Sequence, residues 1–311
     1  MGEVAMAMQE YLGDNERFAD LFNGIFFYGK QVIPAEQLSE SSEKYTVKRR
    51  GQKRTEEFRD IKKILSNGTM LRVLALEAQN YVDYMMPLRC MEYDVQEYLK
   101  QVKKLKKLHF QKKDCKGKHE WLSGIKKGDR LAPVYTVCLY HGEDEWDGPV
   151  KLSEMMDFGA DEEGMSSKFS DYPMRLYSLN EQENFDQFHT DLKEVFRAFS
   201  CRKDREKLRE LVQENEAYRQ MPEDAVEVMA KLLNWKELEE NKAKYMNRDE
   251  EGRERYNMCQ ALMEIKEEGL QEGTKRVIIN MINKGFDEAD ICQITECSHE
   301  FFDRVRREMT K

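Results

Sequence analysis

The chain lacks a long hydrophobic run, a paired cysteine motif and an apolar leader. Nowhere do its 311 residues contain the stretch of about 18 apolar residues needed to cross a bilayer. The first residues, MGEVAMAMQEYLGDNER, become acidic where a secretory signal would be apolar, so we expect neither a signal peptide nor a membrane partner. The seven cysteines are scattered and form no CxxC pair, which predicts reduced thiols and a cytoplasmic protein.

The chain also lacks an excess of positive charge. Its formal net charge of -9 argues against a protein that coats nucleic acid indiscriminately. Hydrophobic residues make up 40% and charged residues 36%, a balance that favours much exposed helix over a compact sheet protein. Two basic stretches, KYTVKRRGQKR and KQVKKLKKLHFQKK, stand out, and a local basic groove is compatible with them because attraction depends on where charges lie.

Apolar spacing predicts helices and strands in the first two thirds of the chain. ERFADLFNGIFFYGKQVI predicts an amphipathic helix that ends near Gly29. FRDIKKIL and MLRVLALEAQN predict two strands joined by a turn at Asn67-Gly68. Pro87 begins a predicted helix of about 20 residues, and LAPVYTVCLYHG predicts a central strand. We therefore expect an α/β domain over residues 12–200, with a mixed central sheet flanked by helices.

From about Ser200 onward the composition shifts toward charge. Residues 201–275 are dense in Lys, Glu and Arg at helical spacing and carry no strand signal. GFDEADICQITECSHEFFDRVRRE predicts two short helices around Thr295 to Ser298, which fit either a plain helical hairpin or a DNA-reading helix-turn-helix. We expect residues 201–311 to form a charged helical region that could mediate a homo-oligomer.

The predicted hairpin brings polar residues together. A turn centred on Asn67-Gly68 places Asp60 opposite Ala75, so that Asp60, Glu77 and Gln79 share one face of the sheet. Asp60 and Glu77 are then diagonal neighbours, roughly 7–8 Å apart at Cα. Two converging carboxylates need a shared proton or a cation, and with no His or thiolate nearby the cation would be Mg²⁺ or Mn²⁺. Solvated acids at a strand edge are the alternative.

The pattern D…E-x-Q across a hairpin, between two helices and before a strand, resembles the PD-(D/E)XK nuclease superfamily. RDIKK, LEAQNYVDYMMPLRCMEYDVQEYLKQV and HEWLSGIKKGDRLAPVYTVCLYHGEDEWDGPVKLSEM are more specifically similar to the Rpn family recombination-promoting nucleases, also grouped as PD-(D/E)XK nuclease family transposases. The resemblance covers about residues 12–200. It implies a restriction-endonuclease-like core and a magnesium-dependent endonuclease that acts on duplex DNA, linked to recombination or mobile elements.

The resemblance also implies roles for single residues. Asp60 and Glu77 would hold the metal, and Gln79 would take the place usually held by Lys and position the attacking water. Gln supplies hydrogen bonds but no charge, so a catalytically weak or inactive DNA-binding or protein-interaction module on the same fold is the alternative. Asp20 is a weaker third metal candidate, for which a solvated helix face is the commoner explanation. We find no separate set of acids for a transposase proper.

Basic residues on the long predicted helix are candidates for DNA contact. They are Arg89, Lys103, Lys104, Lys106 and Lys107. The alternatives are a salt bridge from Arg89 to Asp83 or Glu92 and, for the lysines, a solvated helix face. Nearby, Cys115 with His109 and His119 suggests zinc, but the set lacks a fourth ligand at a recognisable spacing, so we do not expect a zinc site.

Overall fold

The computed structural model describes residues 3–40, 61–67, 70–160 and 164–309. These residues form two compact units, one of residues 1–203 with 231–233 and one of residues 204–230 with 234–311. The sequence predicted a division between residues 200 and 201. The α/β class is confirmed, because the first unit is built on a mixed sheet with helices on both faces.

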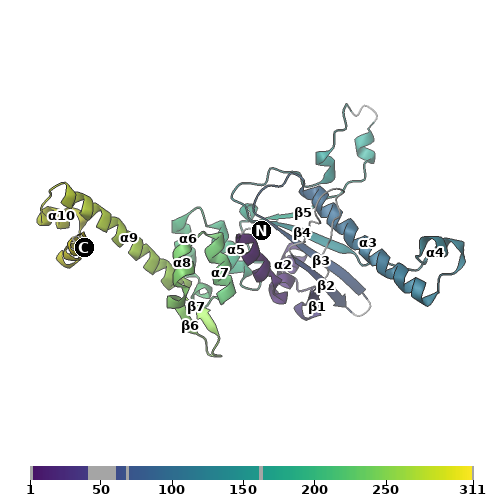
Figure 1. Ribbon diagram of the computed structural model, residues 1–311, viewed down its shortest axis with the longest axis horizontal. Helices are drawn as coiled ribbons and strands as arrows, with labels where there is room; N and C mark the ends of the chain where they lie inside the picture. The colour runs from purple at the N-terminus through teal and green to yellow at the C-terminus, as the bar shows by residue number, and fades with distance from the viewer. Residues whose placement is uncertain (1–2, 41–60, 68–69, 161–163, 310–311) are drawn as a thin grey trace. The chain divides into compact units, whose positions relative to one another are not determined.

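Among the described residues, the sheet of the first unit has five strands in chain order (Figure 1). They are β1 (Leu38–Glu40), β2 (Ile61–Asn67), β3 (Met70–Gln79), β4 (Val134–Tyr140) and β5 (Arg175–Ser178). β1, β2 and β3 pair antiparallel, whereas β3, β4 and β5 pair parallel. β3 therefore lies at the centre, between an antiparallel and a parallel neighbour. β1 and β5 escaped prediction because three or four residues are too few to show a period.

Two consecutive lysines on β2 show which helices cover which face. Lys63 bonds to the carbonyl of Gly13 and to Asn15, where α1 (Glu3–Gly13) meets α2 (Asn15–Phe27). Lys62 points the other way, and its Nζ donates to Glu97 of α3 (Met86–Lys112) at 3.0 Å. Successive side chains of a strand alternate between faces, so α1 and α2 cover one face and α3 the other. α5 (Leu192–Ser200) joins α2 through a hydrogen bond from Arg17 to Asp191.

The predicted hairpin register is wrong by two residues. Asn67 pairs with Met70 instead of forming the turn, so the connection lies at residues 68–69. Lys62, and not Asp60, lies opposite Ala75. An even shift keeps every side chain on its predicted face, because the side-chain period of a strand is two. The assignment of Glu77 and Gln79 to one face is therefore unaffected.

α3 is longer than expected, with 27 residues. Figure 1 shows it running past the edge of the sheet, with α4 (Gly117–Ser123) at its far end. The chain then returns along α3, where Gln101 exchanges two hydrogen bonds with the backbone of Ala132 and the Tyr98 hydroxyl accepts one from the Val134 amide. We call residues 100–130 the α3–α4 arm.

Both units contain short 3-10 helices, and the second unit is mainly helical. The 3-10 helices are η1 (Ala35–Gln37), η2 (Leu152–Met155), η3 (Met165–Lys168), η4 (Leu179–Glu181), η5 (Glu216–Arg219) and η6 (Lys242–Tyr245). The later helices are α6 (Arg205–Glu214), α7 (Glu223–Leu232), α8 (Lys236–Asn241), α9 (Met258–Asn283), α10 (Glu288–Thr295) and α11 (His299–Met309). A strand pair, β6 (Met246–Arg248) with β7 (Glu254–Tyr256), corrects the expectation of helices alone; its three-residue strands are too short to detect.

The two predicted helices at the end of the chain are confirmed as α10 and α11. They separate at Glu296, which adopts the left-handed backbone conformation with φ 53°. Ile278 of α9, Ile291, Phe302 and Val305 form the buried core of this three-helix group. No helix in the described part of the chain is both long and apolar enough to span a bilayer.

The buried Lys62–Glu97 pair gives a test of the packing of α3 on the sheet. We expect Lys62→Met or Glu97→Leu alone to lower the free energy of unfolding by about 3 kcal/mol, because each removes the opposite charge that lies 3.0 Å from a buried ion. The double variant should recover most of that loss. Urea unfolding measures all three proteins. As a control, Lys193→Met at the exposed pair with Asp186 should cost less than about 1 kcal/mol, and equally small losses at Lys62 and Glu97 would contradict the analysis.

Candidate active site

Glu77 and Gln79 lie on the face of β3 that α3 covers. Glu77 is 1% exposed and Gln79 is 6% exposed. Their neighbours on the parallel strand β4 are Cys138 and Tyr140. A buried carboxylate needs a compensating partner, so Glu77 is not an ordinary solvated acid at a strand end. The prediction that both side chains share one side of the sheet is confirmed by the ladder.

Arg89 is the cation nearest to Glu77 that α3 provides. Its guanidinium lies 4.0 Å from the Glu77 carboxylate and donates to Asp83 at 2.6 Å. Burial opposes the charge on Arg89, yet hydrogen bonds to Asp83 and Tyr93 and the charge of Glu77 raise its pKa above the usual value. The salt bridge from Arg89 to Asp83, the alternative to DNA contact, is present in the structure. Pro87 lies in the first turn of α3, where its missing amide proton costs no helical hydrogen bond.

Asp60, the predicted second carboxylate, lies outside the described residues. The predicted meeting of Asp60 with Glu77 therefore stays a prediction. The Glu77 carboxylate and the Gln79 amide both present hard oxygen atoms, a donor type that fits Mg²⁺ or Mn²⁺. A cation bound there would share Glu77 with Arg89, whose positive charge lies on the same carboxylate.

Asp20, the third predicted acid, has a structural role. It is 3% exposed on α2, and its Oδ2 accepts three hydrogen bonds, from the His189 amide and from the amide and hydroxyl of Thr190. Its Oδ1 has no hydrogen-bond partner among the described residues. α2 contacts Lys63 through Asn15 and Phe18, on the face of the sheet opposite α3. Asp20 thus fixes the loop before α5, and the structure does not bring it to Glu77.

His141 lies beside the end of β3 and was assigned no role from the sequence. It follows β4 directly, and its backbone amide donates to the Gln79 carbonyl at 2.8 Å. The side chain is 4% exposed, and its Nε2 has no hydrogen-bond partner in the described ranges. Burial lowers the pKa of His141 to about 4, so the ring is neutral at pH 7. The only signal in the sequence was a histidine at the end of an apolar strand, VCLYH.

An acidic pocket of about 500 Å³ opens where β3 and β4 end. Its walls are Asn80, Tyr81, Val82, Tyr84, Glu143, Asp144, Glu145 and Asp147. The Tyr84 hydroxyl donates to Asp147 at 3.1 Å, which links the two loops. Four carboxyl groups beside Gln79 favour cations over phosphates at this end of the sheet.

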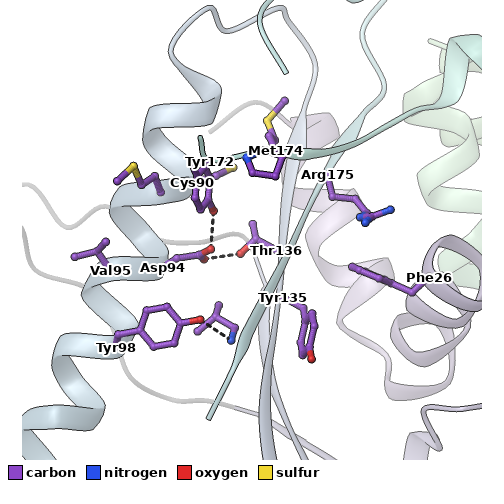
Figure 2. A pocket seen from close by; sticks show the side chains of 13 residues that line it. Phe26, Cys90, Asp94, Val95, Tyr98, Tyr135, Thr136, Tyr172, Met174 and Arg175 are labelled. Carbon is purple, nitrogen blue, oxygen red and sulfur yellow. Dashed lines mark hydrogen bonds between the residues drawn. The ribbon is translucent and has the colours of Figure 1, made fainter. Parts of the chain in front are cut away.

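A second pocket, of about 440 Å³, lies between α3 and the first half of β4 (Figure 2). At its centre the Asp94 carboxylate accepts hydrogen bonds from the hydroxyls of Thr136 at 2.7 Å and Tyr172 at 2.6 Å. At its rim the Arg175 guanidinium lies 4.9 Å from the centre of the Phe26 ring. Asp94 therefore connects α3 to β4 and to the segment that leads into β5. No local sequence pattern predicted these contacts.

The structure places His109 between two acids. Its Nδ1 lies 2.7 Å from Asp114 and its Nε2 lies 2.9 Å from Asp129. The ligand atoms of His109, Asp114 and Cys115 lie within 4.8 Å of one another, close enough to share one metal ion. His119 is exposed on α4. The hydrogen bond with Asp114, followed by that with Asp129, raises the pKa of His109 and favours the doubly protonated ring.

The predicted DNA-contacting residues are spread along α3. Lys103, Lys104, Lys106 and Lys107 are exposed on the arm, whereas Arg89 is half-buried at the other end of the helix. The other basic stretch, KYTVKRRGQKR, lies outside the described residues. The structure thus separates the candidate active site from the predicted lysine contacts.

No family model matches this chain, and neither a curated protein nor a solved structure shows detectable similarity to it. The assignment of a function therefore depends on the residues and contacts described above.

The buried His141 predicts a loss of stability in mild acid. Its folded pKa, about 4, lies below the ordinary value of 6.5, so only the unfolded chain binds a proton between these values. The free energy of unfolding should fall as the pH drops from about 6.5 to 4, by roughly 3 kcal/mol in total. Denaturant unfolding at several pH values should show a flatter profile for His141→Gln. The exposed control His119→Gln should follow wild type, and an unchanged profile in His141→Gln would refute the prediction.

Proposed function

We propose that this protein is a metal-dependent endonuclease that hydrolyses phosphodiester bonds in duplex DNA, linked by its resemblance to recombination or mobile elements. The observation that carries the proposal is the buried carboxylate of Glu77, on the same face of the central strand as Gln79 and beside the Arg89 cation. Packing alone gives no reason for an acid and an amide at these two positions. The helix, hairpin, long helix and strand in the first unit support the same proposal.

Each residue has a distinct role in this proposal. Asp60 and Glu77 hold Mg²⁺ or Mn²⁺, which when bound supplies an activated water and stabilises negative charge on the phosphodiester. Arg89, 4.0 Å from the Glu77 carboxylate, helps to hold that carboxylate in place. Gln79 orients the attacking water through a hydrogen bond from its amide.

The alternative is a catalytically inactive DNA-binding or protein-interaction module. It is favoured by the 4.0 Å contact in which Arg89 already supplies positive charge to Glu77, and by Gln79 in place of a charged Lys. A calorimetric titration with Mg²⁺ separates the two. An active site should bind the ion in wild type and lose that binding in Asp60→Asn and Glu77→Gln, whereas an inactive module should show no difference among the three proteins.

The nuclease proposal predicts magnesium-dependent nicking of supercoiled plasmid. Asp60→Asn and Glu77→Gln should each lower the nicking rate by at least about 100-fold, because a lost metal ligand removes several kcal/mol of transition-state stabilisation. Glu10→Gln, which alters an exposed acid of α1, should retain the wild-type rate. Equal rates in wild type and in both site variants would exclude Asp60 and Glu77 as the catalytic carboxylates.

A further inference from the structure

The α3–α4 arm concentrates positive charge on an acidic protein. Residues 100–130 contain twelve Lys and Arg against three Asp and Glu, a formal charge of +9 in a chain whose net charge is -9. The rest of the chain therefore carries -18. Nine of the lysines are exposed; they are Lys103, Lys104, Lys106, Lys107, Lys112, Lys113, Lys116, Lys118 and Lys127. A polyanion that approaches this protein is attracted to the arm before any other described surface.

The three acids of the arm are occupied with its internal structure. Asp114 and Asp129 hold His109 between them, and Asp114 also binds Lys126 at 3.1 Å. Glu120 accepts the backbone amide of Lys116 at 2.7 Å. Lys103, Lys106, Lys107 and the exposed lysines beyond them form no ion pair with any described residue. The positive charge of these lysines is therefore available to a partner.

Two aromatic side chains are presented among these lysines. Phe110 is 84% exposed near the end of α3, and Trp121 is 75% exposed on α4. Phe110 follows Lys106 and Lys107 by four and three residues, so all three lie on the same helix face. Exposing two large rings costs free energy in water, and neither ring covers a core.

Contacts along its length give the arm a defined shape. The end of α4 lies against α3, because a side chain at Gly124 would come within 3.1 Å of the Lys106 side chain. The His109 contacts hold the middle, and the Gln101–Ala132 hydrogen bonds hold the base. Phe110 and Trp121 are thus carried on helices that are braced from both sides, which lowers the entropic cost of binding.

We propose that the α3–α4 arm binds single-stranded DNA, with its lysines on the phosphates and with Phe110 and Trp121 stacked on unpaired bases. The choice of DNA rests on the proposed function, and the proposal adds a class of ligand to it: DNA with unstacked bases, held away from Glu77. Aromatic rings interleaved with cations are the pattern that tracks a single strand, because every base has a flat face and every linkage a charge. An anionic membrane would call for an apolar face separated from the lysines, whereas Phe110 lies among them.

Fluorescence anisotropy in EDTA tests the proposal without any cleavage. Wild type should bind a labelled single strand of about 20 nucleotides more tightly than the matching duplex, since only unpaired bases can stack. Phe110→Ala with Trp121→Ala should weaken single-strand binding roughly tenfold to hundredfold. Tyr28→Ala, which removes an aromatic ring that is 88% exposed elsewhere, should leave binding unchanged. A Trp121→Phe variant should bind the single strand more tightly than a Trp121→Ala variant, because the smaller ring of Phe still stacks on a base.

Charge variants test the phosphate contacts. Lys103→Gln with Lys107→Gln should reduce the slope of log affinity against log salt by about one to one and a half. Lys30→Gln with Lys284→Gln, which removes the same charge at two exposed positions elsewhere, should not change the slope. The proposal would be overturned if the aromatic double variant bound the single strand with wild-type affinity, or if wild type bound duplex as tightly as the single strand. It would also be overturned if wild type bound only to vesicles that contain phosphatidylserine.

The outcome for the arm is distinguishable from the outcome for the nuclease. Glu77→Gln should bind the single strand as wild type does while losing magnesium-dependent nicking. The Phe110→Ala, Trp121→Ala double variant should lose single-strand binding even if neither wild type nor any variant nicks plasmid.

Discussion

The pairing of buried charges between α3 and the sheet is the constraint on which the rest of the first unit depends. On the face of the sheet that α3 covers, Lys62 of β2 pairs with Glu97 of α3, and Glu77 of β3 lies near Arg89 of α3. Buried ions tolerate little displacement from their partners, so these two contacts, about two helical turns apart, fix both the position and the rotation of α3. The candidate active site and the projection of the arm beyond the sheet are two results of that one placement.

The two ends of α3 meet opposite electrostatic surroundings. Near its start, the loop after β4 places four acids, from Glu143 to Asp147, at the end of the sheet. Near its end, the arm carries its excess of lysines. A nucleic acid would thus be attracted by one end and repelled by the other unless cations intervene. The proposed metal requirement and the proposed DNA-binding surface on the arm would both fit that arrangement.

Sequence patterns predicted most elements near the candidate site but not their long-range contacts. Apolar spacing located α2, β3, α3 and β4, because each is long enough to show its period. The hairpin register failed because Asn67-Gly68 is a strong turn signal, yet Asn67 belongs to the ladder. Asp94 could not be interpreted, since its partner Tyr172 lies 78 residues away. His141 was missed for the same reason: its burial depends on what packs around the end of β4.

The length of α3 has a geometric consequence. Arg89 and Phe110 lie on one uninterrupted helix, so with a rise of about 1.5 Å per residue they are separated by roughly 30 Å along its axis. In a strand with B-form spacing, about 3.4 Å per nucleotide, that separation corresponds to about nine nucleotides. A helix without a break behaves as a spacer of fixed length. A single DNA molecule in contact with both ends would therefore place its unpaired bases at a set distance from Glu77, independent of sequence.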